Sequence, residues 1–200
     1  MRPRLVIPRL GGCVPQRGNR FSRWLGRLMM RIGRWRISGE LPNVPRCVLV
    51  VAPHSSNWDF PAGLGAKWAL GLKVTFLGKD TLFHFPLGNV LRWLGGVPVD
   101  RAHGAPVVNA AVEALEEASQ LWLVIAPEGT RSAVARWKTG FHRIALQAGV
   151  PVLPVALDWG RKQIRIFGLF QPGPDMDADV ERLMRLYQDV RPRRQVGMAA

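Results

Sequence analysis

Short apolar runs alternate with longer amphipathic stretches along most of the chain. Runs rich in Val, Leu and Ile have the length of strands and few polar residues, which is typical of strands buried on both faces of a sheet. The stretches between them repeat apolar residues at spacings of three and four, as helices that pack one face on a core do. This pattern predicts strands at 47–52, 73–78, 96–101, 121–127, 151–158 and 162–168, and helices at 60–71, 86–94, 105–120, 139–150 and 177–190.

The alternation of strands and helices predicts an α/β fold, in which a layered, largely parallel sheet is flanked by helices. Gly63 and Gly65 weaken the helical signal at 60–71. The chain has 200 residues, of which 48% are hydrophobic, and this size fits one globular domain with a sizeable core. We expect residues 1–36 to form a separate N-terminal arm and residues 37–200 to form the domain itself, beginning with a turn at 38–43.

The arm is strongly basic. Residues 1–46 contain eleven arginines and one acidic residue, Glu40, while the whole chain has a net charge of +14. Residues 20–35 place arginines on much of one helical face and apolar residues on the other, namely Phe21, Trp24, Leu25, Leu28 and Ile32. This pattern predicts a basic amphipathic helix that lies in the interface of a bilayer. An ordinary surface helix packed on the core is the alternative. The two interpretations are compatible if the helix docks on the core by one edge only.

The positive charge by itself fits either nucleic acid or an anionic membrane surface. No recognition motif accompanies the charge, so we expect no nucleic-acid partner. No stretch approaches the ~20 apolar residues needed to span a bilayer, and Pro8 and Arg9 end the N-terminal apolar run too early for an export signal. Cys13 and Cys47 form neither a disulfide framework nor a metal-ligand spacing. We therefore expect no metal site, and a peripheral location on the cytoplasmic face of the cell membrane.

The apolar run at 47–52 ends in the polar segment PHSSNWD, which contains His54 and Asp59. Loops at the carboxyl ends of parallel strands form the ligand crevice of such a sheet. Positions five apart lie on different faces of a continuous helix, so these two side chains meet only if the loop turns, with Ser55, Ser56 or Asn57 capping the next helix. Asp59 then accepts a hydrogen bond from one imidazole nitrogen, and the other nitrogen serves as a general base. A structural His with a capping Asp, or a metal site, is the alternative.

The run at 121–127 ends in a second polar loop, PEGTRS. Gly129 lets the backbone approach a ligand closely, Thr130 offers a donor, and Arg131 presents a forked cation suited to phosphate. Glu128 can orient Arg131 or neighbouring amides. This loop alone is compatible with a tight turn that carries a surface arginine. Two such loops at the carboxyl ends of two strands favour a functional site.

Four segments in order resemble the motifs of the PlsC-like glycerolipid acyltransferases, the lysophosphatidate acyltransferase family. HSSNWD matches the H-x4-D signature of that family, and PEGTRS matches its third motif. GVPVDR at 96–101 is similar to the second motif, and VPVLPVAL at 150–157 is similar to the fourth. The resemblance runs from about Arg34 to Phe167 and implies a fold like that of glycerol-3-phosphate acyltransferase.

The resemblance implies transfer of a fatty acyl group from acyl-CoA or an acyl carrier protein to the free hydroxyl of a lysophospholipid. The implied acceptor is 1-acylglycerol 3-phosphate, and no cofactor is implied beyond the thioester co-substrate. His54 is then the general base and Asp59 orients it, with no acyl-enzyme. The residues implied to bind or shape the substrate pocket are Lys79, Arg101, Glu128, Gly129, Thr130 and Arg131.

Two departures from the family pattern concern the acceptor. Pro98 and Val99 replace an aromatic or Ile-rich segment of the second motif, and a short AVAR segment follows PEGTRS where many relatives have a longer, glycine-containing loop. Another lysolipid, such as an ornithine-type one, is therefore an alternative acceptor. A basic membrane-surface protein without turnover is the alternative from a different functional class.

Overall fold

The structure of the chain is a computed structural model that describes residues 8, 10–99, 104–129 and 136–193. Within these residues, seven strands form one sheet in the order β1-β7-β6-β2-β5-β3-β4. Neighbouring strands are parallel, except for the antiparallel pair β6 and β7. The strands are β1 (Arg36–Ser38), β2 (Arg46–Ala52), β3 (Thr75–Lys79), β4 (Gly96–Val99), β5 (Leu121–Ile125), β6 (Val152–Asp158) and β7 (Gln163–Ile166). The predicted largely parallel α/β architecture is confirmed.

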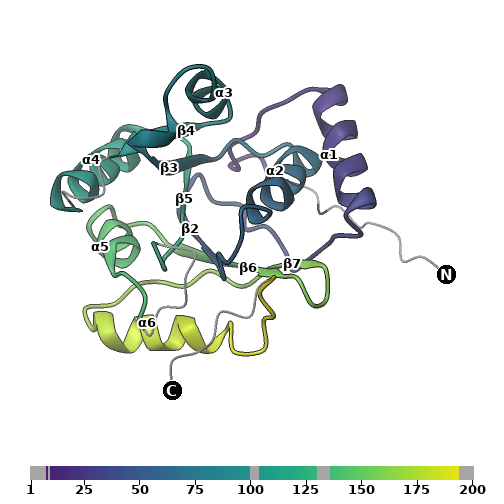
Figure 1. Cartoon of the computed structure of the whole chain (residues 1–200). Coiled ribbons are helices and arrows are strands. Elements are labelled where there is room, and N and C mark those ends of the chain that lie inside the picture. The colour runs from purple at the N-terminus through teal and green to yellow at the C-terminus, as the bar shows by residue number, and fades with distance from the viewer. Residues whose placement is uncertain (1–7, 9, 100–103, 130–135, 194–200) are drawn as a thin grey trace.

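Helices cover both faces of this sheet (Figure 1). One face carries α4 (Gly104–Glu117), α5 (Gly140–Gln147) and α6 (Met176–Arg185). The other face carries α2 (Asp59–Leu70), with α1 (Arg20–Ile32) packed on its outer side. The 3-10 helix η1 (Asp80–Leu82) and α3 (Leu87–Trp93) lie near the edge strand β4. Among the helices of the described residues, none has the length and apolar character required to cross a membrane.

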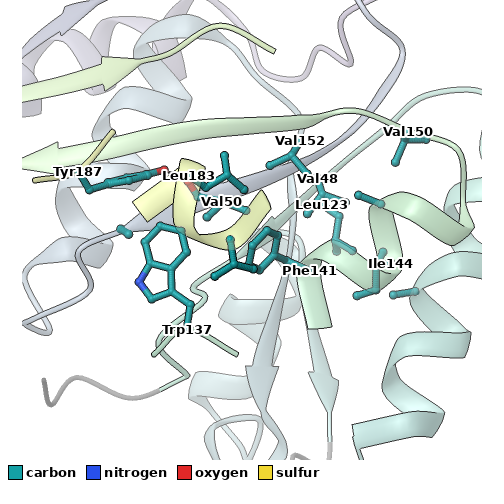
Figure 2. Packing of buried hydrophobic residues seen from close by; sticks show 14 of the residues in the cluster. Val48, Val50, Leu123, Trp137, Phe141, Ile144, Val150, Val152, Leu183 and Tyr187 are labelled. Atoms are coloured by element: carbon teal, nitrogen blue, oxygen red, sulfur yellow. Dashed lines mark hydrogen bonds between the residues drawn. The ribbon is translucent and has the colours of Figure 1, made fainter. Parts of the chain in front are cut away.

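The central strands are buried on both faces because successive side chains point in opposite directions. Val48 and Val50 of β2 pack with Leu123 of β5 on the face that α4, α5 and α6 cover (Figure 2). Cys47 and Leu49 of the same strand join the core beneath α2. Each fully buried aliphatic side chain of this kind contributes roughly 1.5–3 kcal/mol relative to exposure. Two-sided burial explains why these strands read as continuous apolar runs.

The helix α1 docks on α2 by one edge. A Cβ atom at Gly26 would lie 2.2 Å from the backbone nitrogen of Ala69, so only glycine permits this close approach of the two helices. Met30 is buried beside this contact, whereas Phe21 and Trp24 remain 66% and 56% exposed. The predicted amphipathic helix is therefore present, and its apolar residues are divided between a docked edge and an exposed face. Its contact with a membrane stays a prediction.

Candidate active site

Three neighbouring strands bring the site together at one edge of the sheet. β2 is parallel to both β5 and β6, and Ala52 of β2 pairs with Ala156 of β6. The carboxyl ends of the three strands therefore open onto the same edge, where a parallel sheet places its ligand crevice. The segments that follow the strands carry His54, Glu128 and Trp159.

The His54 ring lies in contact with the Asp59 carboxylate. Nδ1 of His54 lies 3.3 Å from Oδ2 of Asp59, and the two side chains are 27% and 1% exposed, respectively. An acceptor opposite Nδ1 favours the tautomer that carries its proton on Nδ1, so Nε2 is the basic atom of the ring. The pair is thus arranged as a general base and the acid that orients it.

Asp59 itself closes the loop between the two residues. Its Oδ2 accepts hydrogen bonds from the backbone amides of Ser55 at 2.8 Å and Ser56 at 2.7 Å. The N-cap residue of α2 is Trp58, which makes no side-chain capping bond. Ser56 Oγ accepts a hydrogen bond from the Trp58 amide at 3.2 Å, so the predicted capping role falls to Ser56, in the turn that leads into α2. The loop amides point toward the carboxylate of Asp59, in the first turn of α2. Asp59 therefore organises the loop.

Trp159 holds the other oxygen of Asp59. Its indole Nε1 donates a hydrogen bond to Asp59 Oδ1 at 2.7 Å. The indole packs edge-to-face on Trp35, with 4.8 Å between ring centroids, and the Trp159 amide donates to the Arg191 carbonyl at 2.9 Å. Trp159 was not among the predicted site residues. Its position directly after the buried strand β6, at the same sheet edge as His54, is the signal that could have identified it.

Two cations stack on Trp159. The guanidinium carbon of Arg193 lies 4.8 Å from the Trp159 ring centroid and 4.8 Å from that of Trp58. Nζ of Lys162 lies 4.1 Å from the Trp159 centroid. The Arg193 amide also donates to Ser55 Oγ at 3.1 Å. These contacts join the segment after α6 to the loop that carries His54 and Asp59.

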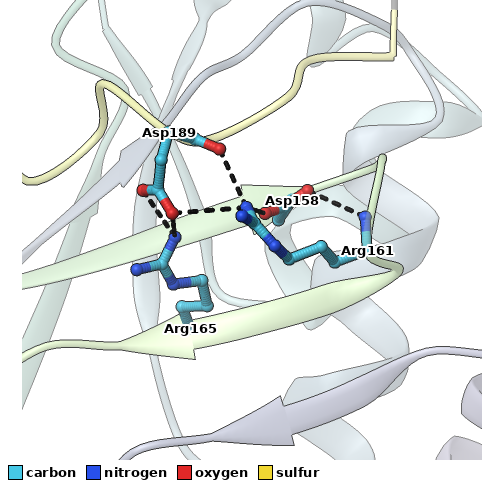
Figure 3. Close-up of polar contacts among 4 residues, drawn as sticks. All are labelled: Asp158, Arg161, Arg165 and Asp189. Carbon is cyan, nitrogen blue, oxygen red and sulfur yellow. Dashed lines mark hydrogen bonds and ion pairs between the residues drawn. The ribbon is translucent and has the colours of Figure 1, made fainter.

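A salt-bridge network holds that segment on the β6–β7 hairpin (Figure 3). Asp158, buried at the end of β6, accepts hydrogen bonds from the Arg161 amide at 2.9 Å and guanidinium at 2.8 Å. Arg161 also donates to the Asp189 carbonyl at 2.8 Å, and Arg165 donates to both Asp189 carboxylate oxygens, at 2.8 and 2.9 Å. Burial raises the pKa of Asp158, but the hydrogen bonds and charge of Arg161 outweigh burial and hold the pKa below its usual value.

Glu128 supports His54 from the adjacent strand. Its Oε2 accepts a hydrogen bond from the His54 backbone amide at 2.7 Å. Burial raises the pKa of Glu128 to about 7, against the lowering effect of the His54 hydrogen bond and with a further rise from the Asp59 charge. Glu128 was predicted to orient Arg131 or neighbouring amides. It does orient an amide, but that amide is the one of His54, in the loop after β2. Arg131, the other predicted partner of Glu128, lies outside the described residues.

The remaining predicted residues divide into two groups. Lys79 and Gly129 border the same cavity as His54. Lys79 is the last residue of β3, and Gly129 has a positive φ of 65°, with the Lys138 side chain so close that a Cβ at Gly129 would lie 2.9 Å from it. Lys138 is thus a basic residue beside this loop that the sequence analysis did not single out. Three predicted substrate-binding residues lie outside the described residues: Arg101, Thr130 and Arg131.

A cavity of about 1090 Å³ extends from His54 between α2 and the sheet. Small residues of α2 leave this space: Gly63 and Ala66 line it, and a Cβ atom at Gly63 would meet no atom within 4 Å. The half-buried Lys67 also lines it and donates to the Leu94 carbonyl, and burial lowers the pKa of Lys67 to about 8. The sheet wall is apolar and consists of Leu49, Val51, Val124, Val155, Leu157, Ile164 and Ile166. The cavity is thus large and apolar enough for an elongated apolar group beside His54.

Comparison with known proteins identifies similar sequences and a similar fold. The sequence model of the Acyltransferase family matches residues 36–158. The 1-acyl-sn-glycerol-3-phosphate acyltransferase of Haemophilus influenzae is 26% identical over 156 residues, which cover 72% of this chain and 62% of the relative. The enzyme of the same name from Pseudomonas aeruginosa is 30% identical over 157 residues, which cover 74% of this chain and 58% of the relative. The chain thus spans about three fifths of these relatives.

One solved structure shares the fold. The crystal structure of the 1-acyl-sn-glycerophosphate (LPA) acyltransferase PlsC from Thermotoga maritima superposes with a TM-score of 0.58 at 22% sequence identity. The superposition covers 86% of this chain and 80% of that chain. The expected glycerolipid acyltransferase type of fold is therefore confirmed.

Proposed function

This chain belongs to the acyltransferase family, and from this premise we propose that it transfers a fatty acyl group from an acyl thioester to a lysophospholipid hydroxyl. The donor is acyl-CoA or an acyl carrier protein, the acceptor is 1-acylglycerol 3-phosphate, and the product is phosphatidic acid. One observation carries the proposal: the His54–Asp59 pair borders an apolar cavity of about 1090 Å³. A base beside such a cavity suits a reaction between an alcohol and an acyl chain.

His54 acts as the general base in this reaction. Nε2 takes the proton of the acceptor hydroxyl while the hydroxyl oxygen attacks the thioester carbonyl carbon. Asp59, held by Ser55, Ser56 and Trp159, keeps the ring in place and stabilises the imidazolium that forms. Collapse of the tetrahedral intermediate breaks the C–S bond, and the imidazolium returns the proton to the leaving thiolate. No covalent acyl-enzyme is required, and no cofactor other than the thioester takes part.

Basic residues near the cavity support an acceptor that carries a phosphate. Lys79 borders the cavity, and Lys138 lies over Gly129 on the neighbouring loop. We assign Arg101 and Arg131 to the same phosphate, because a guanidinium forms paired hydrogen bonds with phosphate oxygens. We also assign Thr130 and Gly129 to the wall of the phosphate site, and Glu128 accepts a hydrogen bond from the His54 amide. The reaction takes place at the cytoplasmic face of an anionic membrane, from which the lipid acceptor comes.

Purified protein incubated with acyl-CoA or acyl carrier protein and a panel of lysolipids tests the proposal. Thiol release and product mass identify donor, acceptor and turnover together. His54→Ala and Asp59→Asn should each lower turnover by about 10²–10⁴-fold, because each disables the general base. His84→Ala is the matched control, since His84 is exposed and lies outside the cavity lining.

The panel also separates the alternatives. Turnover on an ornithine-type or other lysolipid, and none on 1-acylglycerol 3-phosphate, would replace the proposed acceptor. A folded wild-type protein that releases no thiol with any acceptor would contradict the enzymatic proposal and favour a membrane-surface protein without turnover.

A further inference from the structure

Large apolar side chains on one side of α3 have no role in the site described above. Leu87, Val90 and Trp93 recur at a spacing of three, and they are 52%, 51% and 60% exposed. Phe85, just before the helix, is 87% exposed. We call these four residues the α3 face. Gly88, Leu91 and Leu94 of the same segment are buried, and Asn89 and Arg92 occupy the rest of its exposed surface.

The exposed sides of α4 and α6 differ from the α3 face. α4 exposes Glu113, Glu116 and Glu117, and α6 exposes Asp177 and Glu181. These helices follow the usual rule of an apolar side toward the core and a polar side toward water. A group of large, exposed apolar side chains such as the α3 face is typical of a surface that binds a partner or a membrane.

The α3 face continues into the wall of the cavity. Leu82 of η1, three residues before Phe85, is 44% exposed and lines the cavity. Phe60 and Trp58, at the beginning of α2, also line it and are 40% and 58% exposed. Exposed apolar side chains therefore extend from α3 to the side of the cavity at which His54 lies.

Cationic and aromatic residues flank the α3 face. The Arg17 guanidinium lies 5.7 Å from the Trp93 ring centroid and donates to the Trp93 carbonyl at 3.0 Å. This contact joins the face to the N-terminal end of α1, where Phe21 and Trp24 are exposed. The arginines exposed on α1 are Arg20, Arg27 and Arg31.

An aliphatic surface flanked by aromatic and cationic side chains has the composition of a protein surface that enters an anionic bilayer. Tryptophan is enriched at the level of the headgroups, and arginine binds anionic lipid there. A second copy of this chain fits less well, because a net charge of +14 on each copy opposes association.

We propose that the α3 face inserts into the bilayer beside the mouth of the cavity, while the α1 arginines bind the anionic headgroups. The lipid acceptor then moves from the membrane into the cavity without crossing bulk water. This route for the acceptor rests on the proposed function, whereas insertion of the α3 face does not require turnover.

Two matched double variants test the insertion. Leu87→Ser with Val90→Ser removes half of the α3 face, and Leu146→Ser with Leu186→Ser removes exposed leucines of α5 and of the segment after α6. Binding to phosphatidylcholine–phosphatidylglycerol vesicles is measured by co-sedimentation at about 1 M salt, where the screening length is only about 3 Å. The α3 double variant should bind about tenfold more weakly than wild type, because membrane binding scales with buried apolar area. The control variant should bind as wild type does.

Equal binding of both double variants, or equal loss in both, would overturn the proposal. A change from dimer to monomer in sedimentation velocity, with unchanged vesicle binding, would assign the α3 face to a second copy instead. Neither measurement uses substrate. A failure of acyl transfer in the earlier assay would therefore leave this result intact, and a failure of vesicle binding would leave the turnover result intact.

A labelling experiment gives an independent readout. Cys13 is exposed and Cys47 is fully buried, so Cys13→Ser leaves a background suited to a single added label. A polarity-sensitive dye on Leu87→Cys should shift its emission to the blue with the same vesicles, and the dye on Leu146→Cys should not. Identical emission at the two positions would contradict insertion.

Discussion

Asp59 has donors on both of its carboxylate oxygens, and these donors come from distant parts of the chain. Ser55 and Ser56 bind one oxygen from within the loop, and Trp159 binds the other from the end of β6. A buried oxygen that loses its donor costs about 1–3 kcal/mol. The orientation of His54 therefore depends on a tryptophan outside the two polar loops identified from the sequence.

Trp159→Phe should test this dependence, because phenylalanine keeps an aromatic ring and lacks the indole N–H. The carboxylate, with one donor fewer, should bind the imidazolium more strongly. The acidic limb of the pH profile of kcat/KM should then move to higher pH, with kcat lowered by about tenfold. The measurement is a pH–rate profile beside that of Trp58→Phe, whose ring does not donate to Asp59. A purely structural role for Trp159 would lower stability without moving the acidic limb.

Glu128 should make stability fall as pH rises from about 4.5 to about 7. Its pKa is about 7 in the folded chain against an ordinary value of 4.5, so between these values the folded state binds more protons than the unfolded state. The free energy of unfolding should therefore fall by about 3 kcal/mol between pH 4.5 and pH 7, relative to Glu128→Gln. Chemical denaturation of both proteins across this range checks the difference. Parallel curves for the two proteins would contradict it.

At the scale of elements, two glycines of α2 have different surroundings. Gly65 lies against Met29 of α1, and Gly63 lies over the cavity. Glycine weakens a helix by roughly 1 kcal/mol relative to alanine. The weakness of the helical signal at 60–71 thus corresponds to close helix packing on one side and an open cavity on the other.

Gly63→Leu should fill part of the cavity. The added side chain meets open space and improves helix propensity, so the melting temperature should be unchanged or higher. Activity toward long acyl chains should fall by about tenfold or more, while activity toward the shortest chains should persist. Ala178→Leu on the exposed side of α6 is the control. Equal activity of Gly63→Leu toward all chain lengths would show that the acyl chain binds elsewhere.

The elements were predictable where burial and periodicity agree. β2, β5 and β6 are two-sided strands, so their apolar runs identify them directly. β1 has only three residues, Arg36–Ser38, and too short a pattern to be recognised. α3 was predicted, but not its exposed apolar residues, because buried Leu91 and exposed Leu87 and Val90 are equally apolar in the sequence. Periodicity indicates which side is buried only where the other side is polar.

The site was predictable only as far as each polar loop extends. His54, Asp59 and Glu128 follow buried strands, and the structure places them in contact. Trp159 and Arg193 belong to later segments, and only the packing of β6 and of the residues after α6 brings them to Asp59. Such contacts leave no local pattern in the sequence.

At the scale of the whole molecule, the positive charge is concentrated on the α1 side. Deletion of the arm would remove Met30 and Trp35 from the core, so substitution is the better test. Replacing three exposed arginines of α1 by glutamine should weaken binding to anionic vesicles at low salt by about 3 kcal/mol, or about 100-fold. These are Arg20, Arg27 and Arg31.

The control variant has the same net charge as the α1 triple variant, but its substitutions lie on the other face of the sheet. Its three glutamines replace Arg143, Arg182 and Arg185 of α5 and α6. Vesicle binding across a salt series compares the two variants. An equal loss in both would mean that total charge, and not its position, governs the attraction.

The contact of Arg193 with the His54–Asp59 loop has a consequence for biosynthesis. A ribosome releases the loop and most of the sheet well before Trp159 and Arg193 emerge, and domains begin to fold from the N-terminal side. The nascent protein therefore passes through a stage in which β2 and β5 have been made and the Asp59 carboxylate still lacks its Trp159 donor. A translation product that stops after α6 keeps Trp159 but lacks Arg193 and the buried residues Tyr187 and Val190, so it should be less stable than the full chain and turn over less substrate.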